Sequence, residues 1–347
     1  MTKELDLTFT KVMTDWYAEN KRDLPWRIDK NPYHVWVSEI MLQQTRVEAV
    51  RDYYIRFMNE LPAVKDLAQA DEQTLLKLWQ GLGYYNRIRN MHKAATVIEQ
   101  DFGGVFPKTY EDIKALPGIG DYTAGAIASI CFDRKVAAVD GNVLRVMSRL
   151  CEDYEDIKNA AMKKRMAAYL QALYPKENCG DFTQGLIELG ALICVPNGQP
   201  KCHACPVSGY CKARANGTIS QLPVKSSKKE RKKIKKIVFI LQCGDKIAVR
   251  KRDKKGLLAG LYEFPNVDQE LTAEQAVKQV EDWGCRPRDL QRKAEYKHIF
   301  THVEWEMTGY YFSCDSENED FQWANQKRNG RGDSSALRIW IFHLTCA

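Results

Sequence analysis

The segment that most constrains the fold of this chain spans residues 116–140 and reads LPGIGDYTAGAIASICFDRKVAAVD. Pro117 and Gly118 end one helical pattern, and Gly120 permits the turn before a helix of small apolar residues, predicted over 123–131. Such a hairpin leaves backbone N–H groups exposed at a helix start, where they can hold a phosphate. The pattern predicts an α-helical domain with an anion-binding turn.

A lone acid, Asp140, begins the next helical pattern, predicted over residues 140–150. An N-cap position would place Asp140 at the start of this helix while its carboxylate still faces a groove. The apolar residues that recur at i, i+3, i+4 and i+7 are predicted to be buried, and they are Val143, Val146, Met147 and Leu150.

A second acid, Glu39, lies in a helical pattern over residues 31–51 that predicts one helix continuing through Val47. Its neighbours on that helix include Val35, Trp36 and Leu42, so its carboxyl is expected to be desolvated, which raises the pKa and suits a general acid. A surface glutamate paired with Arg46 is the alternative. One carboxyl with a raised pKa beside one ionised carboxylate is the arrangement that cleaves glycosidic bonds through an oxocarbenium-like transition state.

Composition limits the class of protein. The 347 residues favour two domains, and a net charge of +7 favours a polyanionic partner. No run of 18 apolar residues predicts a membrane span, and the first 20 residues lack a signal-peptide pattern. Eleven cysteines without a secretion signal indicate a reducing compartment and metal or cluster binding in preference to disulfides.

Four cysteines form a compact run, CVPNGQPKCHACPVSGYC, interrupted by Pro and Gly. Thiolates select zinc or iron–sulfur centres, and the run has only one of the two Cys-x2-Cys knuckles typical of zinc sites. The spacing therefore favours a [4Fe–4S] cluster over zinc. The predicted ligands are Cys194, Cys202, Cys205 and Cys211.

The spacing of apolar residues along the chain changes from a helical pattern to a strand pattern. Residues 1–214 are rich in helical patterns, among them 73–82 and 86–100, and the basic run 224–236 is predicted to be a solvated linker. The segment that follows is predicted to be a separate α+β domain. Its expected elements are strands over 237–241, 246–250 and 304–312 and a helix over 273–283.

Several motifs together resemble the adenine DNA glycosylase (MutY) family, which belongs to the helix-hairpin-helix superfamily shared with endonuclease III. They are LPWR, NPYHVWVSEIMLQQT, GLGYYNRIRN, LPGIGDYTAGAIA, VDGNVLRVMSRL and the four-cysteine run, and the resemblance extends in order over residues 1–312. It implies a mainly α catalytic region followed by an α+β Nudix-like domain. The expected domains are an iron–sulfur domain (1–30 and 131–214), a six-helix barrel (31–130), a basic linker (215–236) and a lesion-recognition domain (237–347).

The resemblance also implies a reaction, the removal of adenine mispaired with 8-oxoguanine or guanine in double-stranded DNA during base excision repair. Glu39 matches the acid that protonates adenine, Asp140 the carboxylate that stabilises the sugar cation, and Asn142 the supporting amide. Tyr122 stands where lyase relatives carry a lysine, and a tyrosine forms no Schiff base. Hydrolysis without strong lyase activity is therefore expected.

DNA contacts follow from the same resemblance. Gln44 and Tyr84 match residues that fill the gap left by the flipped adenine, and Trp26 and Arg27 match residues that line the adenine pocket. The hairpin glycines Gly118 and Gly120 are expected to approach the DNA backbone, and Phe300, Thr301 and His302 to contact 8-oxoguanine. We expect a monomer in the cytoplasm, associated with the nucleoid of a bacterial-type cell, and no membrane partner.

Two departures from the family pattern concern the cysteine run and the chain end. The first gap between the cysteines is one residue longer than usual, and residues 326–347 match neither the acidic helix nor the basic segment expected there, which suggests a frameshift or an atypical terminus. Three other readings stay open: an endonuclease III-like glycosylase and lyase, a non-enzymatic binding module with zinc, and a Nudix hydrolase. The last lacks the glutamate-rich catalytic helix.

Overall fold

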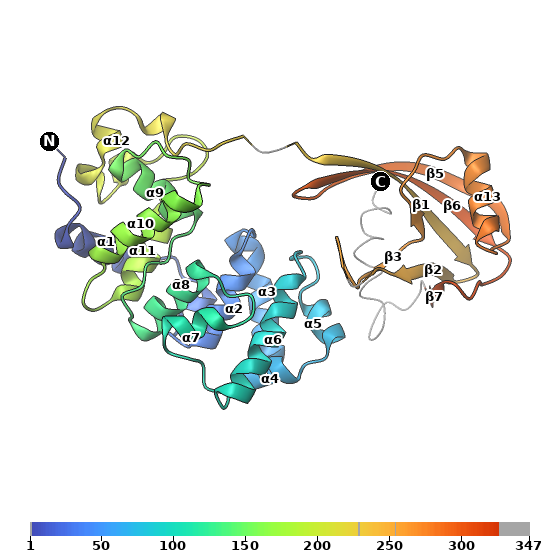
Figure 1. Ribbon diagram of the computed structural model, residues 1–347, viewed down its shortest axis with the longest axis horizontal. Coiled ribbons are helices and arrows are strands. Elements are labelled where there is room, and N and C mark those ends of the chain that lie inside the picture. The colour runs from blue at the N-terminus through green and yellow to red at the C-terminus, as the bar shows by residue number, and fades with distance from the viewer. Residues whose placement is uncertain (1, 228–229, 254, 326–347) are drawn as a thin grey trace. The chain divides into compact units, whose positions relative to one another are not determined.

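The computed structural model describes residues 2–227, 230–253 and 255–325, and the chain divides into two compact units, residues 1–227 and 228–347. The first unit consists of helices joined by short turns, and the second contains a mixed β-sheet with helix α13 (Figure 1). Within the described residues, no helix combines the length and the apolar character needed to cross a membrane. The atypical tail predicted for residues 326–347 lies outside the described residues.

The helices of the first unit follow one another closely along the chain. Their bounds are α1 (Leu7–Asn20), η1 (Pro25–Arg27), α2 (Pro32–Leu42), α3 (Val47–Glu60), α4 (Val64–Gln69), α5 (Glu72–Leu78), α6 (Asn86–Asp101), α7 (Tyr110–Ala115), α8 (Asp121–Phe132), α9 (Gly141–Cys151), α10 (Ala160–Leu173), α11 (Cys179–Leu192), η2 (Cys202–Ala204), η3 (Ser208–Tyr210), α12 (Lys212–Ala215) and η4 (Ile219–Gln221).

Helix α2 begins as its sequence predicts but ends early. The Asn31 side chain accepts a hydrogen bond from the backbone N–H of Tyr33 at 3.0 Å, and a proline occupies the first helical position. The prediction of one helix continuing through Val47 is wrong, because α2 ends at Leu42 and Gln44 adopts a left-handed backbone with φ of 61°. Carbonyls at this end of α2 accept hydrogen bonds from Arg87, a cap supplied by another part of the chain.

The predicted hairpin is present between α7 and α8. Gly118 has a φ of 79°, and a Cβ atom there would lie 2.6 Å from the Cβ of Asn90, so both its backbone and its surroundings require glycine. Helix α8 packs tightly against the segment that precedes α9, since a Cβ on Gly125 would lie 2.8 Å from the carbonyl oxygen of Ala137. This close approach brings the start of α8 near Asp140.

Helices α1, α9, α10 and α11 share one hydrophobic core, which includes Phe9 from α1 and Phe182 from α11. The side chain of Asp140 accepts a hydrogen bond from the backbone N–H of Val143 at 2.7 Å, so the predicted N-cap of α9 is confirmed. The four apolar residues predicted to be buried on this helix are also buried.

The second unit is built on a mixed sheet with strand order β3-β2-β1-β6-β5, in which β4 pairs with β1 and β7 pairs with β2. Strands β1 and β6 are parallel, with Phe239 opposite Tyr310, and the other strand pairs among the described residues are antiparallel. The elements are β1 (Lys232–Cys243), β2 (Lys246–Lys251), β3 (Tyr262–Glu263), β4 (Asn266–Val267), α13 (Ala273–Asp282), β5 (Pro287–Ile299), β6 (Val303–Cys314) and β7 (Gln322–Asn325).

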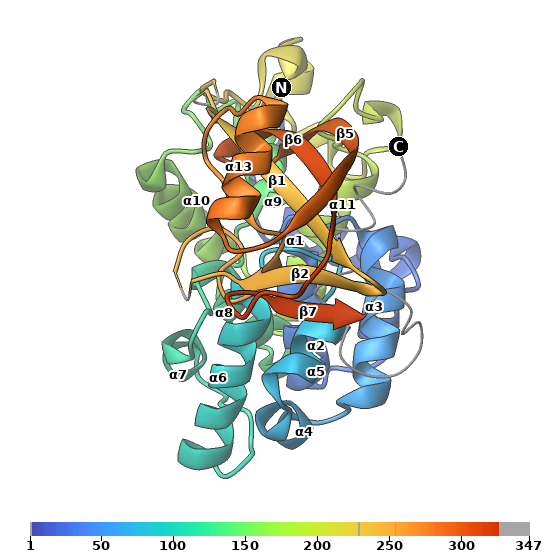
Figure 2. The same ribbon diagram turned by 90° about the vertical axis from the view of Figure 1, so that its right-hand side faces the viewer.

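Alternate side chains of β1 enter two different cores. Phe239 and Leu241 pack with Ala276 and Val280 of α13, which covers this face of the sheet (Figure 2). Val238 and Ile240 point to the opposite face, where they pack with residues of β2 and β6. Successive side chains therefore alternate between the two faces of the sheet, which confirms the strand predicted over 237–241.

The second unit differs from the predictions in the start of β1 and in four strands that were not predicted, β3, β4, β5 and β7. Strand β1 begins at Lys232, inside the segment predicted to be a linker, because backbone pairing with β6 extends over its basic residues. Strand β5 was not predicted, since its side chains are mostly exposed on both faces and give no apolar alternation.

A Gly125→Ala substitution tests the tight packing of α8. The added methyl group would meet a backbone carbonyl at 2.8 Å, so we expect the protein to lose about 1–3 kcal/mol of unfolding free energy. Urea unfolding monitored by circular dichroism measures this loss. Gly209→Ala is the matched control, because its methyl group would meet no atom within 4 Å; equal stability of the two variants would contradict the packing described.

Candidate active site and cysteine centre

Glu39 lies on α2 beside the first turn of α8. The pKa of Glu39 is raised to about 7, chiefly by burial. A hydrogen bond from Tyr122 and the positive charge of Arg27 oppose this increase in pKa, whereas the negative charge of Asp140 adds to it. A carboxyl with this pKa is partly protonated at neutral pH and is able to donate a proton. The structure therefore brings together Glu39, Tyr122 and Asp140, which are separate in the sequence.

Asp140 accepts hydrogen bonds at both carboxylate oxygens. The backbone N–H of Val143 and the side-chain amide of Asn142 each donate to it at 2.7 Å. Burial raises the pKa of Asp140 above its usual value, and these two donors together with the positive charge of Arg145 oppose part of this increase. Donors on both oxygens stabilise the ionised form of Asp140, as a carboxylate that faces a developing positive charge requires.

Arg145 orients the amide of Asn142 and connects α9 with the segment after α11. Its guanidinium donates to Asn142 Oδ1 at 2.8 Å, to the carbonyl of Gly190 at 2.7 Å and to the carbonyl of Cys194 at 2.7 Å. A Cβ on Gly190 would lie 2.7 Å from that of Asn142, so the two helices are in close contact here. Asp140 is thus linked to the cysteine segment by consecutive hydrogen bonds.

A buried ion pair joins the turn η1 to α11. The carboxylate of Glu188 has no exposed surface and accepts hydrogen bonds from Arg22 at 2.8 and 2.9 Å and from Arg27 at 2.9 and 3.2 Å. Burial alone would raise the pKa of Glu188, but these donors outweigh it and lower the pKa to about 2. The adjacent Trp26 ring is buried and packs edge-on against Tyr54 with a centroid separation of 5.4 Å.

Gln44 and Tyr84 are predicted to fill the gap left by the flipped adenine, and we call them the wedge residues. They lie in two turns that are both bound to Arg87. Both side chains are exposed, 48 % for Tyr84, and both residues have positive φ angles. Arg87 donates to the carbonyl of Gln43 at 2.7 Å and to that of Gly83 at 3.2 Å. Gln44 follows α2 rather than lying within it, which corrects its predicted position.

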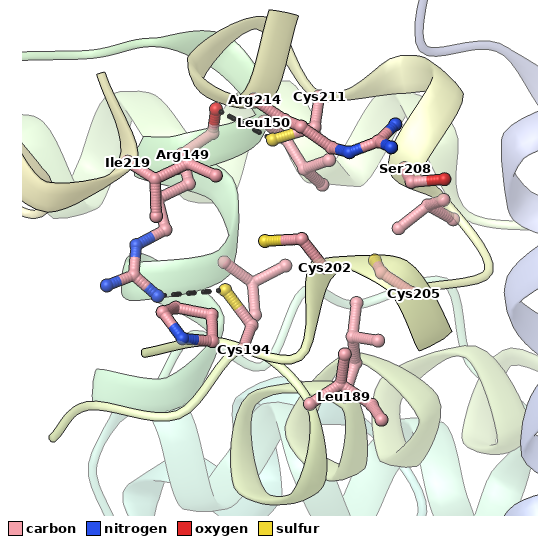
Figure 3. A pocket seen from close by; sticks show the side chains of 14 residues that line it. Arg149, Leu150, Leu189, Cys194, Cys202, Cys205, Ser208, Cys211, Arg214 and Ile219 are labelled. Atoms are coloured by element: carbon pink, nitrogen blue, oxygen red, sulfur yellow. Dashed lines mark hydrogen bonds between the residues drawn. The ribbon is translucent and has the colours of Figure 1, made fainter. Parts of the chain in front are cut away.

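The four cysteines of the predicted cluster line one pocket of about 400 Å³, part of it open to solvent, with apolar residues such as Leu150 and Leu189 (Figure 3). They come from the segment after α11, from η2 and from the start of α12. Arg149 donates to the sulfur of Cys194 at 3.2 Å, and the Cys211 thiol lies 3.5 Å from the carbonyl of Arg149.

This set of donors has the chemistry of a thiolate-bound metal centre, either an iron–sulfur cluster or zinc. All four donors are sulfur, which excludes ions that prefer oxygen ligands. Among the described residues, no three His, Cys, Asp or Glu side chains converge closely enough to hold one metal ion, although the four thiols border a common space. A cationic donor to one thiolate also matches the net negative charge of such a centre.

Phe300, Thr301 and His302 form the turn between β5 and β6. The Phe300 ring is partly buried and lies edge-on to Trp305 at 4.7 Å and to His298 at 4.4 Å, whereas Thr301 and His302 are exposed. The backbone N–H of Phe300 donates to the carbonyl of Val303 at 2.8 Å. The turn therefore anchors one aromatic side chain and presents two polar ones.

Sequence reasoning missed four charged residues: Arg22, Arg87, Arg145 and Glu188. Glu188 gave a usable signal, because it is a single acid within the apolar pattern GLIELGALI, and a charge in such a position needs a buried partner. Arg145 gave a similar signal, because it is a charged residue among the buried apolar residues of α9. Arg87 gave none, since its partners are backbone carbonyls, and those at the end of α2 are distant in the chain.

Replacement of Glu188 by glutamine tests the buried ion pair. The folded pKa is depressed, so the ionised carboxylate contributes stability above its unfolded pKa, and this contribution is lost as pH falls toward about 2. We expect Glu188→Gln to lower the unfolding free energy at neutral pH by about 3 kcal/mol, because two guanidinium groups lose their counter-charge. Denaturant unfolding measures the loss. Glu177→Gln, at an exposed position, is the control; an equal effect would contradict the assignment.

Each of the two structural units matches a known protein family. Residues 37–173 match the HhH-GPD superfamily of base excision DNA repair proteins, and residues 237–332 match the NUDIX domain. The chain is 36 % identical over 299 residues to an adenine DNA glycosylase of Buchnera aphidicola subsp. Baizongia pistaciae, covering 86 % of this chain and 84 % of that one. It is 33 % identical to the rat adenine DNA glycosylase, covering 89 % of this chain and 71 % of the relative.

Solved structures support the same fold for the first unit. A thermostable thymine-DNA glycosylase aligns with a TM-score of 0.53 and 28 % identity, over 60 % of this chain and 96 % of that protein. An endonuclease III in a non-covalent DNA complex aligns with a TM-score of 0.51 at 21 % identity, over 60 % of this chain and 95 % of that one, which shows the fold alone. The predicted helix-hairpin-helix region followed by a Nudix-like domain is thus confirmed, and the chain belongs to the adenine DNA glycosylase family.

Proposed function

We propose that this chain hydrolyses the N-glycosidic bond of adenine mispaired with 8-oxoguanine or guanine in double-stranded DNA. The observation that carries the proposal is the pair of carboxyl groups, Glu39 with a pKa raised to about 7 and Asp140 with donors on both oxygens. Family membership supports the choice of adenine as the base.

The two carboxyl groups act on opposite parts of the substrate. Glu39 donates a proton to the adenine ring, so that the bond between the base and C1′ of the sugar breaks with a neutral leaving group. The sugar becomes an oxocarbenium-like cation, which the Asp140 carboxylate stabilises. Asn142 holds this carboxylate in place, and Arg145 in turn holds the amide of Asn142. Water adds to C1′ and gives a proton to the Glu39 carboxylate, which restores the acid and leaves an abasic site.

Tyr122 determines the class of reaction. Its hydroxyl donates to Glu39, and burial raises its pKa well above the usual value, so it remains a neutral donor. A phenol forms no Schiff base with the opened sugar, and hydrolysis without strand cleavage is expected.

Access to adenine requires base flipping, because the glycosidic bond of a stacked base is out of reach. Gln44 and Tyr84 occupy the vacated space in the duplex, and stacking on an aromatic ring contributes about 1–3 kcal/mol per base. The flipped adenine enters beside Trp26 and Arg27. Hydrogen bonds to Glu188 set the orientation of the Arg27 guanidinium. Gly118 and Gly120 approach the phosphate backbone at the hairpin.

The β5–β6 turn reads the opposite base. Thr301 and His302 are exposed hydrogen-bonding side chains next to the packed Phe300 ring, an arrangement that suits contact with the polar edge of 8-oxoguanine. Pyrophosphatase activity is not proposed, since the sequence lacks the glutamate-rich Nudix helix.

A [4Fe–4S] cluster held by Cys194, Cys202, Cys205 and Cys211 would order the segment between α11 and α12. Protein prepared with iron should be brown and contain iron and acid-labile sulfide in equal amounts, whereas zinc alone would contradict the proposal. We further propose a monomer that acts on DNA in the cytoplasm of a bacterial-type cell.

Replacement of the proposed acid separates catalysis from binding. We expect Glu39→Gln to bind duplex DNA as the wild type does and to release adenine at least about 10²-fold more slowly, since general acid catalysis is lost. Single-turnover assays with adenine opposite 8-oxoguanine, guanine or thymine measure this, with and without alkali. Glu60→Gln, at an exposed position on α3, is the control.

Each outcome of this assay has a defined meaning. Alkali-dependent cleavage, fastest opposite 8-oxoguanine and absent opposite thymine, supports hydrolysis and lesion recognition. Full activity of Glu39→Gln would refute the catalytic assignment, and trapping of a covalent DNA adduct by borohydride would favour a lyase mechanism. Wild-type protein that contains iron but releases no adenine would refute the proposed function.

A further inference from the structure

Arg87, near the start of α6, binds two segments that are distant in sequence. Its Nη1 donates to the carbonyls of Ile40 at 2.7 Å, Met41 at 3.1 Å and Gln43 at 2.7 Å. Its Nη2 donates to the carbonyls of Leu82 at 3.0 Å and Gly83 at 3.2 Å. One guanidinium thus joins the end of α2 to the turn before α6.

The position of the guanidinium is itself fixed. It lies over the fully buried ring of Trp79, with its central carbon 5.2 Å from the ring centroid. The indole N–H of Trp79 donates to the carbonyl of Gly83 at 3.0 Å, so the ring and the guanidinium bind the same peptide group. The turn before α6 therefore has little freedom relative to Arg87.

The bound carbonyls immediately precede the two wedge residues. Gln43 precedes Gln44, whose φ is 61°, and Gly83 precedes Tyr84, whose φ is 48°. Positive φ angles at residues with a Cβ are unfavourable and persist only where the surrounding structure enforces them. Hydrogen bonds to the preceding peptide groups supply that restraint at both positions through a single side chain.

We propose that Arg87 is a positioning residue for base flipping, which holds Gln44 and Tyr84 at a fixed separation before DNA arrives. The inference rests on the proposed function, because it assigns these two side chains to the opened duplex. Pre-organised wedge residues lose less conformational freedom on insertion, so more of the contact energy offsets the unstacking of adenine.

The shape of arginine is required for this role. Its planar guanidinium presents donors in a fixed fork and reaches both sets of carbonyls, whereas a lysine ammonium is a single centre on a flexible stem. Arg87→Lys retains the positive charge and any general attraction to phosphate but is unable to reproduce both sets of hydrogen bonds. The substitution therefore separates positioning from charge.

The test compares adenine release from two duplexes in single-turnover assays. In the first duplex, adenine faces 8-oxoguanine. In the second, adenine faces an abasic site, so it has no pairing partner and flips more readily. For Arg87→Lys we expect release from the first duplex to slow about 10- to 100-fold and release from the second to slow much less. The ratio of the two rate constants is independent of the fraction of folded protein.

Binding alone supplies a second readout. The probe is a duplex with 2-aminopurine at the target position, whose fluorescence rises when it leaves the stack. In a Glu39→Gln background, addition of Arg87→Lys should lower this rise. Arg89→Lys is the matched control, because Arg89 lies on the same helix and its side chain donates to Glu72 at 2.8 Å on the surface.

Two results would overturn the inference: equal slowing on both duplexes, which indicates a general defect of the active site, or no effect of Arg87→Lys on either rate or fluorescence. These are distinguishable from a failure of the proposed function. In that case the wild-type protein releases no adenine, while the fluorescence comparison between Arg87→Lys and Arg89→Lys still reports on the wedge residues.

Discussion

The desolvation of one carboxyl group, that of Glu39, is the constraint on which the proposed chemistry depends. Helix α2 is apolar on nearly every side, and this burial is the largest cause of a pKa near 7. Asp140, close by, is also buried but receives two hydrogen bonds that favour its charge. The fold thus gives two chemically similar side chains opposite roles, a proton donor and a stabilising anion.

Arginines hold this arrangement together by binding groups that the helices leave unpaired. Arg22 and Arg27 neutralise the buried Glu188, Arg145 binds the amide of Asn142 together with carbonyls near the cysteine segment, and Arg87 binds the end of α2. A planar guanidinium serves several acceptors at once, which explains why it recurs where elements distant in sequence meet. These contacts connect the candidate site to the helices that surround it.

The sequence was most informative where the signal is local. The hairpin turn, the N-cap at Asp140 and the buried stripe of α9 depend on residues within one or two helical turns, and the structure confirms them. The end of α2 was predicted wrongly, because its cap comes from Arg87 in another helix. Strand β5 was missed since its mostly exposed residues give no apolar alternation, and its partner strand β6 is not evident from the local sequence. The acid role of Glu39, its pairing with Asp140 and the cysteine ligands followed from local patterns, whereas the roles of the other candidate site residues came from the family resemblance. All of these roles stay predictions.

The pH dependence of single-turnover adenine release tests the central claim most directly. If Glu39 donates the proton, the rate constant must fall as pH rises through about 7, because the protonated fraction of its carboxyl falls there. Substitution by glutamine should remove this descending limb together with most of the rate. A wild-type rate constant that stays level between about pH 6 and about pH 8 would contradict the account, since a carboxyl that titrates in this range would then play no part in the reaction.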